Sequence, residues 1–141
     1  MNEIRFDIQH SEFGNLVVPI IDGKSLISIL KEVELPFAKS EGSPSIAGAY
    51  DGVPKDIVKL PSEHLLGKPK RRYSYEGKSS VLECNCGESG CWSFITKVEV
   101  DEKKVRWSNF EQIHRPNWKY EAIGEFIFDR QQYEQALSKI I

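Results

Sequence analysis

Residues 79–100 read SSVLECNCGESGCWSFITKVEV, and this stretch decides the fold predicted for the chain. Two runs rich in β-branched and aromatic residues, a composition that favours strands, flank a short connection from Gly87 to Gly90. Because glycine tolerates the positive φ angles of tight turns, two glycines in so short a connection indicate a β-hairpin. The simplest register of this hairpin gives three pairs: Cys86 with Cys91, Cys84 with Ser93, and Leu82 with Ile95.

All cysteines of the chain lie within this hairpin: Cys84, Cys86 and Cys91. The side chains of a strand alternate between its two faces. In the register above, the three cysteines therefore share one face, and their sulfur atoms converge at the tip of the hairpin. No other part of the sequence concentrates side chains with comparable reactivity.

The first interpretation of the cysteines is a metal site. Thiolates favour zinc, and a structural zinc site has four protein ligands, so one ligand must come from another residue. His114 is the best candidate, because Arg115 and Pro116 break the preceding strand and place its imidazole on a loop. Only one residue separates Cys84 from Cys86, whereas paired cysteine ligands are usually separated by roughly two to four residues. The candidate ligands for zinc are Cys84, Cys86, Cys91 and His114.

Other interpretations of these residues remain open. Cys86 and Cys91 face each other in the predicted register and can form a disulfide, which a reducing cytosol disfavours. Alternatively, the three thiols are free and pack as small apolar side chains under a helix. A catalytic thiol needs a basic partner, and no histidine (His10, His64 or His114) lies in a familiar local motif with a cysteine. His114 is then a histidine that is hydrogen-bonded within the core.

Signals on both sides of the hairpin predict an α+β fold. The expected strands cover residues 4–8, 16–21, 72–76, 79–86, 91–101, 105–113 and 120–128. Apolar residues recur at helical spacing near residues 24–34 and 130–140. We therefore predict a mainly antiparallel β-meander sheet with two helices packed on one face, in a single domain of residues 1–141.

Both predicted helices carry recognisable boundary signals. Asp22 is the expected N-cap of the first helix, and Pro36 is expected to end it. Asp129 is expected to cap the C-terminal helix, with Gln132 completing a capping box. The apolar residues of that helix form a stripe, so its apolar side, including Leu137, should be buried.

Two segments between the first helix and the meander have less regular signals. Residues 36–56 are rich in glycine, proline and serine and are expected to form a long irregular surface loop. The basic run at residues 68–72 precedes Tyr73 and Tyr75, a composition found on nucleic-acid-binding surfaces. A strand edge protected by lysine and arginine explains this run as well, so nucleic acid is not the expected partner.

Composition and charge limit the class of protein. The chain has 141 residues, of which 40% are hydrophobic, and this suits one domain with a core. A formal net charge of -2 gives no general attraction to nucleic acid or to anionic membranes. The longest apolar run, residues 16–21, is too short to span a bilayer, and the first residues show no secretory signal. We therefore expect a cytoplasmic protein without a membrane partner.

Four motifs in the C-terminal half form one pattern: CxCGxxGCW at residues 84–92, WSxF at 107–110, HRPxWxY at 114–120 and FxFDRxQY at 126–133. This pattern resembles that of a family of small, uncharacterised bacterial proteins, and the resemblance covers roughly residues 80–137. It implies a shared fold and a shared site without assigning a reaction. Glu83 stands where a glycine is expected before the first cysteine, which argues against a tight backbone turn there. Arg115 beside Trp118 forms an anion or aromatic-ligand contact, or else Arg115 caps a strand end and Trp118 fills the core.

Two functional hypotheses follow from these observations. The first is a non-catalytic module that binds a protein partner and whose hairpin tip is stabilised by a structural metal or by packed thiols. The alternative is a small thiol- or metal-dependent enzyme that uses Cys84, Cys86, Cys91 and His114. An enzyme needs an open coordination position or an activated thiol, whereas a structural metal site has four protein ligands.

Overall fold

The N-terminal hairpin forms the first of two antiparallel sheets in the computed structural model, which describes residues 1–141. Strand β2 is the central strand, and its apolar residues are buried along most of its length. Strand β1 pairs with one edge of β2, and the short strands β3 and β5 pair with the other edge. The strands of this sheet are β1 (Ile4–Ser11), β2 (Gly14–Ile21), β3 (Lys24–Ser25) and β5 (Val53–Pro54).

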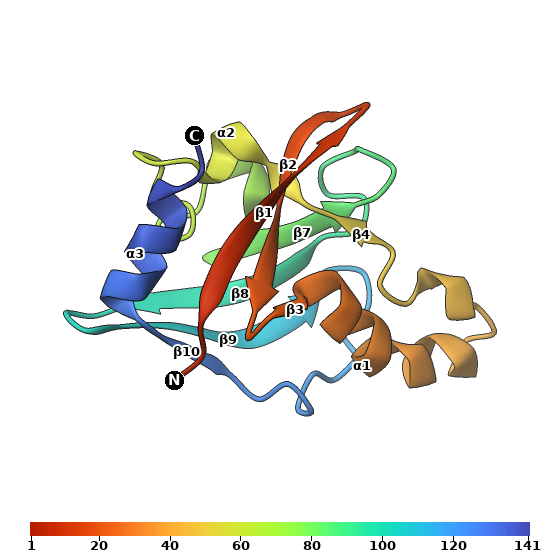
Figure 1. The fold of residues 1–141 in the computed structure, drawn as a ribbon. Helices are drawn as coiled ribbons and strands as arrows, with labels where there is room; N and C mark the ends of the chain where they lie inside the picture. Colours follow the sequence, from red (N-terminus) through yellow and green to blue (C-terminus); the bar gives the residue numbers. More distant parts are fainter.

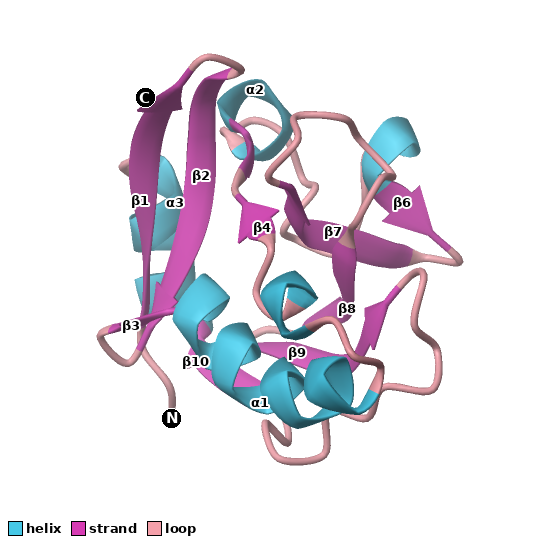
Figure 2. Cartoon of the chain, turned by 90° about the vertical axis from the view of Figure 1, so that its right-hand side faces the viewer, coloured by secondary structure: helices cyan, strands magenta, loops and turns pink.

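The second sheet contains the predicted meander. Strands β7, β8, β9 and β10 lie side by side in chain order, each antiparallel to the next, and β4 and β6 both pair with β7. The N-terminal hairpin crosses in front of this sheet in Figure 1 and stands to one side of it in Figure 2. The strands are β4 (Tyr50–Asp51), β6 (Ser74–Tyr75), β7 (Lys78–Cys84), β8 (Phe94–Val100), β9 (Lys104–Gln112) and β10 (Phe126–Asp129).

Three α-helices accompany the sheets, and the predicted α+β class with antiparallel strands is confirmed. They are α1 (Leu26–Ser40), α2 (Lys55–Val58) and α3 (Arg130–Ser138), and 3₁₀ turns occur at Pro44–Ile46 and Arg71–Tyr73. Helix α3 packs against β1 and β9, whereas α1 packs against β2 and β3 (Figure 1). None of these helices combines the length and the apolar character needed to cross a membrane.

One hydrophobic core joins the two sheets and the helices. It is a cluster of 27 buried residues, drawn from both sheets, from α1 and from α3. At its centre, the Trp107 indole N–H of β9 donates a hydrogen bond to the Tyr133 hydroxyl of α3 at 3.0 Å. That hydroxyl donates in turn to the Leu65 carbonyl at 2.6 Å. The core therefore includes a satisfied polar chain that ties α3 to the meander and to the segment after α2.

The start of α1 differs from the prediction. Its N-cap is Ser25, whose hydroxyl accepts a hydrogen bond from the Ile27 N–H at 3.2 Å. Asp22 occupies the turn between β2 and β3 with a φ of 51°, and its carboxylate accepts a hydrogen bond from the Glu3 N–H at 2.8 Å. The prediction of Asp22 as the cap was wrong because the short strand β3 separates the turn from the helix.

The end of α1 also differs, because Pro36 lies inside the helix. Proline removes one backbone hydrogen bond from a helix, and tertiary contacts hold the turn that follows it. The Phe37 ring stacks on Trp118 with centroids 6.1 Å apart, and Ala38 is fully buried. Residues 36–56 are therefore not one irregular loop: they contain the last turn of α1, a 3₁₀ turn and the strands β4 and β5.

A buried carboxylate on α1 anchors the segment that follows β9. Glu34 is fully buried, and its Oε2 accepts hydrogen bonds from the hydroxyls of Tyr50 at 2.6 Å and Tyr120 at 2.7 Å. Its Oε1 accepts from the Gly48 N–H at 2.9 Å, while the Gln112 amide donates to the Tyr50 hydroxyl at 3.1 Å. Burial raises the pKa of Glu34. The segment between Gln112 and Tyr120, which carries the predicted histidine ligand, is thus held at both ends.

The C-terminal strand and helix show where local signals were sufficient. The Asp129 carboxylate caps α3 by accepting a hydrogen bond from the Gln132 N–H at 3.0 Å, as predicted. The Gln132 side chain does not return to Asp129; it bonds to the backbone N–H and C=O of Ile4. The preceding strand was expected at residues 120–128. It is shorter: β10 begins only at Phe126 and ends at Asp129.

Candidate metal centre

The predicted register of the cysteine hairpin is wrong. Strand β7 pairs with β8 through Ser80 opposite Ile95 and Leu82 opposite Phe94, with an irregularity between the two pairs. Beyond these pairs the two strands separate. Residues 85–93 therefore lie outside the strand pairing and do not form the paired tip of a hairpin. We call residues 84–91, which begin at the last residue of β7, the cysteine loop.

A buried carboxylate near the end of β7 accompanies the separation of the strands. On its other edge β7 continues to pair with β4, where Cys84 lies opposite Tyr50. The Glu83 carboxylate is 5% exposed and accepts hydrogen bonds from the Gly90 N–H at 3.1 Å and from the Ser93 hydroxyl at 2.9 Å. These side-chain bonds replace ladder bonds, so Glu83 closes the base of the loop.

The far end of the loop turns at a glycine that packs against the N-terminal hairpin. Gly87 has a φ of 88°, and its N–H donates to the Cys84 carbonyl at 3.1 Å. A β-carbon at residue 87 would lie 2.5 Å from ring atoms of Phe13, at the turn between β1 and β2. Only glycine fits both the conformation and the contact. Phe13 thus covers one side of the cysteine loop.

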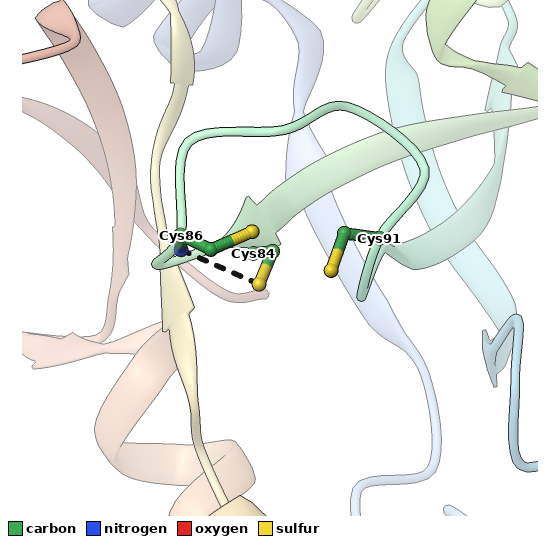
Figure 3. A group of neighbouring side chains, drawn as sticks. All are labelled: Cys84, Cys86 and Cys91. Atoms are coloured by element: carbon green, nitrogen blue, oxygen red, sulfur yellow. Dashed lines mark hydrogen bonds between the residues drawn. The ribbon is translucent and has the colours of Figure 1, made fainter.

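The three sulfur atoms do gather, although by a different route from the one predicted. Those of Cys84, Cys86 and Cys91 all lie within 4.8 Å of one another. In Figure 3, Cys84 and Cys86 come from one limb of the loop and Cys91 comes from the other. The Cys86 N–H donates a hydrogen bond to the Cys84 sulfur at 3.3 Å. The loop therefore presents a three-thiol group, the kind of donor set that binds soft metals.

The spacing of these sulfurs suits a metal ion after a small contraction. Zinc–sulfur bonds of about 2.3 Å in a tetrahedral site place the sulfur atoms about 3.8 Å apart. The sulfurs need to approach by no more than about 1 Å to reach that spacing. Cys86 and Cys91 are exposed, so rotation of their side chains can supply this movement without disturbing the core.

The three thiols differ in how readily they ionise. Burial raises the pKa of the Cys84 thiol to about 12. The Cys86 thiol has a lowered pKa, chiefly because the Cys84 thiol donates a hydrogen bond to its sulfur. A hydrogen bond from the Glu88 backbone N–H lowers it further. The pKa of Cys91 is raised, chiefly because its thiol donates a hydrogen bond to Cys86. Cys86 is therefore the thiol that loses its proton most readily of the three in the metal-free loop.

We expect alkylation of the metal-free, reduced protein to modify Cys86 before the other two cysteines. The thiolate is the reactive form, and a free cysteine ionises only near a pH of about 8.5. Iodoacetamide labelling at pH values below this, followed by peptide mass spectrometry, measures the order. Cys91 is the matched control because it is also exposed but has a raised pKa. Labelling of Cys91 ahead of Cys86 would contradict the assignment.

His114 lies beside the cysteine loop and outside the sulfur group. Its Nε2 is 3.0 Å from the Gly90 carbonyl oxygen, and its ring stacks on Trp92 with centroids 6.3 Å apart. Its backbone N–H donates to the Gln112 side chain at 2.8 Å. The metal-ligating atoms that lie within 4.8 Å of one another are the three sulfurs alone. As a metal ligand His114 therefore stays a prediction, since its ring would first have to leave Gly90.

Arg115 and Trp118 continue the contacts of this segment away from the cysteines. The Arg115 guanidinium lies 5.1 Å from the centre of the Trp92 ring and 5.9 Å from that of Trp118. Its Nε donates to the Glu41 carboxylate at 3.0 Å, and the Trp118 indole N–H donates to the same carboxylate at 2.7 Å. Trp118 is 3% exposed and fills the core. Sequence reasoning did not identify Glu41, and it placed Trp92 in a motif without predicting its contact with Arg115.

The other two histidines are engaged elsewhere. His64 is fully buried: its Nε2 lies 2.8 Å from the Ser80 carbonyl oxygen, and its Nδ1 accepts a hydrogen bond from the Lys70 N–H at 3.0 Å. Burial lowers the pKa of His64, and both ring nitrogens are hydrogen-bonded within the core. His10 is bonded to Asn15 across the β1–β2 hairpin.

Comparison of the chain with protein-family models, with curated proteins and with solved structures gives no match. The resemblance of the C-terminal motifs to small bacterial proteins therefore stays a prediction. The functional argument rests on three observations of this molecule: the free thiols, the distances between their sulfurs, and the residues that hold the loop.

Proposed function

We propose that this protein is a non-catalytic binding module whose cysteine loop is stabilised by a zinc ion bound to Cys84, Cys86 and Cys91. One observation carries the proposal: sulfurs from both limbs of the loop lie within 4.8 Å of one another, although no disulfide joins them. Free thiols that simply fill the core would be buried, yet two of these three are exposed. A shared ion explains why exposed thiols converge.

The metal would act as a cross-link between the limbs of the loop. In its absence the limbs are joined by the bonds from Gly90 and Ser93 to Glu83. The N–H of Cys86 already points at the Cys84 sulfur, and such donors stabilise a thiolate once it is bound to a metal. Metal binding at this position contributes folding free energy to the loop, because the ligands are brought together only in the folded chain.

The surroundings of the thiols support binding of a partner surface over turnover of a small substrate. The cavity beside the loop, lined in part by Phe13, Cys84 and Gly87, has a volume of about 40 Å³. Substrate and cofactor pockets are typically about 300–1,000 Å³. The larger hollow of about 500 Å³ is lined by β1 and α3 and contains no cysteine. The exposed thiols therefore lie on an open surface.

One observation favours the alternative, a thiol- or metal-dependent enzyme. Cys86 is exposed and its pKa is lowered, which are two properties of a nucleophilic thiol. A nucleophile also needs a base within hydrogen-bond reach, and the His114 Nε2 is directed to the Gly90 carbonyl instead. Thiol-dependent hydrolysis of generic ester substrates that is lost in Cys86→Ser and retained in Cys84→Ser would establish this second function.

Zinc titration of the reduced protein tests the proposed function. We expect one equivalent of zinc per chain and a rise in melting temperature that grows with zinc concentration, because a ligand that binds only the folded state stabilises it. Cys84→Ser, Cys86→Ser and Cys91→Ser should each abolish stoichiometric binding. Ser89→Ala is the matched control, since it changes an exposed residue of the same loop that makes no side-chain hydrogen bond. Absence of zinc from the reduced wild-type protein would refute the proposal.

A further inference from the structure

We infer that the fourth ligand of this metal site comes from outside the chain and is a neutral imidazole nitrogen. The inference rests on the proposed function and names the ligand class that completes the same site. The imidazole can belong to a small molecule or to a histidine of another protein molecule. His114, in this arrangement, positions the cysteine loop without binding the metal.

The chain itself offers no free fourth ligand at the three sulfurs. No other cysteine exists, and no histidine, aspartate or glutamate side chain joins the group of mutually close ligand atoms. Both ring nitrogens of His64 are used inside the core, and His10 lies in the N-terminal hairpin. Zinc prefers four ligands, so an ion held by three cysteines of this chain retains one position for another donor.

His114 is held in its present place by contacts on every part of the residue. Its Nε2 lies 3.0 Å from the Gly90 carbonyl oxygen, and its ring stacks on Trp92. Its backbone N–H donates to Gln112 at 2.8 Å, and its carbonyl accepts from Arg115 at 2.9 Å. Rotation of the ring towards the sulfurs would break the first two contacts. The hydrogen bond from His114 to the Gly90 carbonyl instead fixes the position of the residue next to the ligand Cys91.

The remaining coordination position faces solvent. Cys86 and Cys91 are exposed, whereas Cys84 is half-buried and lines the small cavity on the inner side of the loop. Phe13 packs on Gly87 at that inner side, so we place the incoming ligand on the exposed side, where Cys86 and Cys91 lie. The space inside is also too small for a further side chain, because its volume is about 40 Å³.

The charge around the loop selects a neutral donor. Three thiolates leave a zinc site with a net negative charge. The negative charge of the nearby Glu88 carboxylate also disfavours ionisation of both Cys86 and Cys91. No lysine or arginine occurs in the sequence between Lys78 and Lys97, and none forms an ion pair with Glu88. A fourth thiolate or a carboxylate would add another negative charge at short range, and an imidazole adds none. Imidazole nitrogen is also a common zinc ligand.

Spectroscopy of the cobalt(II)-loaded protein tests the inference, because the d–d absorption of cobalt reports its ligands. Imidazole should shift this absorption in a saturable way, with the same half-saturation concentration in the wild type and in His114→Gln, which keeps a donor for the Gly90 carbonyl. If only the variant responds, His114 is the internal fourth ligand and the inference is overturned. If neither responds, no position is open and the inference is also overturned.

Further arms identify the ligand class and its source. Ethanethiol and acetate are the anionic probes, and either one binding at lower concentration than imidazole would overturn the assignment to a neutral nitrogen. A zinc-dependent dimer that imidazole dissolves, measured by light scattering, would assign the source to a second copy of this chain. If the zinc-loaded protein stays a monomer and binds imidazole, the fourth ligand comes from a different molecule, and its assignment as a neutral imidazole nitrogen is supported. Failure to bind cobalt at all would refute the metal site itself, which is a separate result.

Discussion

Replacing Trp107 by alanine should lower the free energy of unfolding by about 3–5 kcal/mol. The Trp107 side chain is fully buried and lies edge-on to the rings of Phe128 and Tyr133. Its removal leaves a cavity at the junction of β9, β10 and α3. It also deprives the Tyr133 hydroxyl of the N–H that donates to it at 3.0 Å. Urea denaturation followed by far-UV circular dichroism measures the effect.

A substitution at the preceding residue, Arg106, provides the control for Trp107→Ala. Arg106 lies on the same strand with 48% of its side chain exposed, and its ion pair with Glu125 spans 3.7 Å. Exposed pairs of this kind contribute about 0–1 kcal/mol, so Arg106→Ala should change the free energy of unfolding by no more than that. Trp107→Phe should fall between the two because it restores most of the ring. Equal denaturation midpoints for Trp107→Ala and Arg106→Ala would show that the centre of the core has been misassigned.

Leu137→Ala should lower the free energy of unfolding by about 2–5 kcal/mol. The Leu137 side chain is fully buried on the inner side of α3, beside Tyr133 and Ala136. Truncation removes apolar area from the core and leaves a cavity that the packed helix cannot close completely. The expected result is a lower urea midpoint with an unchanged slope, because the surface exposed on unfolding stays nearly the same.

Gln135→Ala is the matched control for this helix. Gln135 is exposed and belongs to the same helix, where alanine is at least as favourable as glutamine. The variant should therefore unfold at the wild-type midpoint or slightly above it. A mobile C-terminal tail predicts instead that neither substitution changes the midpoint, and that outcome would remove α3 from the core.

The elements that the sequence predicted well are those specified by neighbouring residues. The start of α3 follows from Asp129 and the helical spacing of its apolar residues, both of which act within one or two turns. The meander follows from β-rich runs separated by short turns, so its strands appear in chain order. The gathering of the three sulfurs was also predictable, because Cys84, Cys86 and Cys91 are close in the chain.

The features that the sequence left undetermined depend on residues far apart in the chain. The register beside the cysteines changed at an irregularity between Ser80 and Leu82, and beyond it Glu83 accepts a hydrogen bond from Gly90 across the loop. Helix α1 continues past Pro36, where Phe37 stacks on Trp118, a residue far away in the sequence. Local propensities contain no information about such partners.

The cysteine loop brings both kinds of information together. By itself the sequence determined that three thiols share one short segment, since covalent connection keeps them near one another. Only the tertiary structure decided how they are arranged and what surrounds them. The buried Glu83 carboxylate must find hydrogen-bond donors, and it takes them from the opposite limb of the loop. The His114 imidazole meets the Gly90 carbonyl because Glu34 and Gln112 hold its segment against the core, through hydrogen bonds that only the folded chain can form.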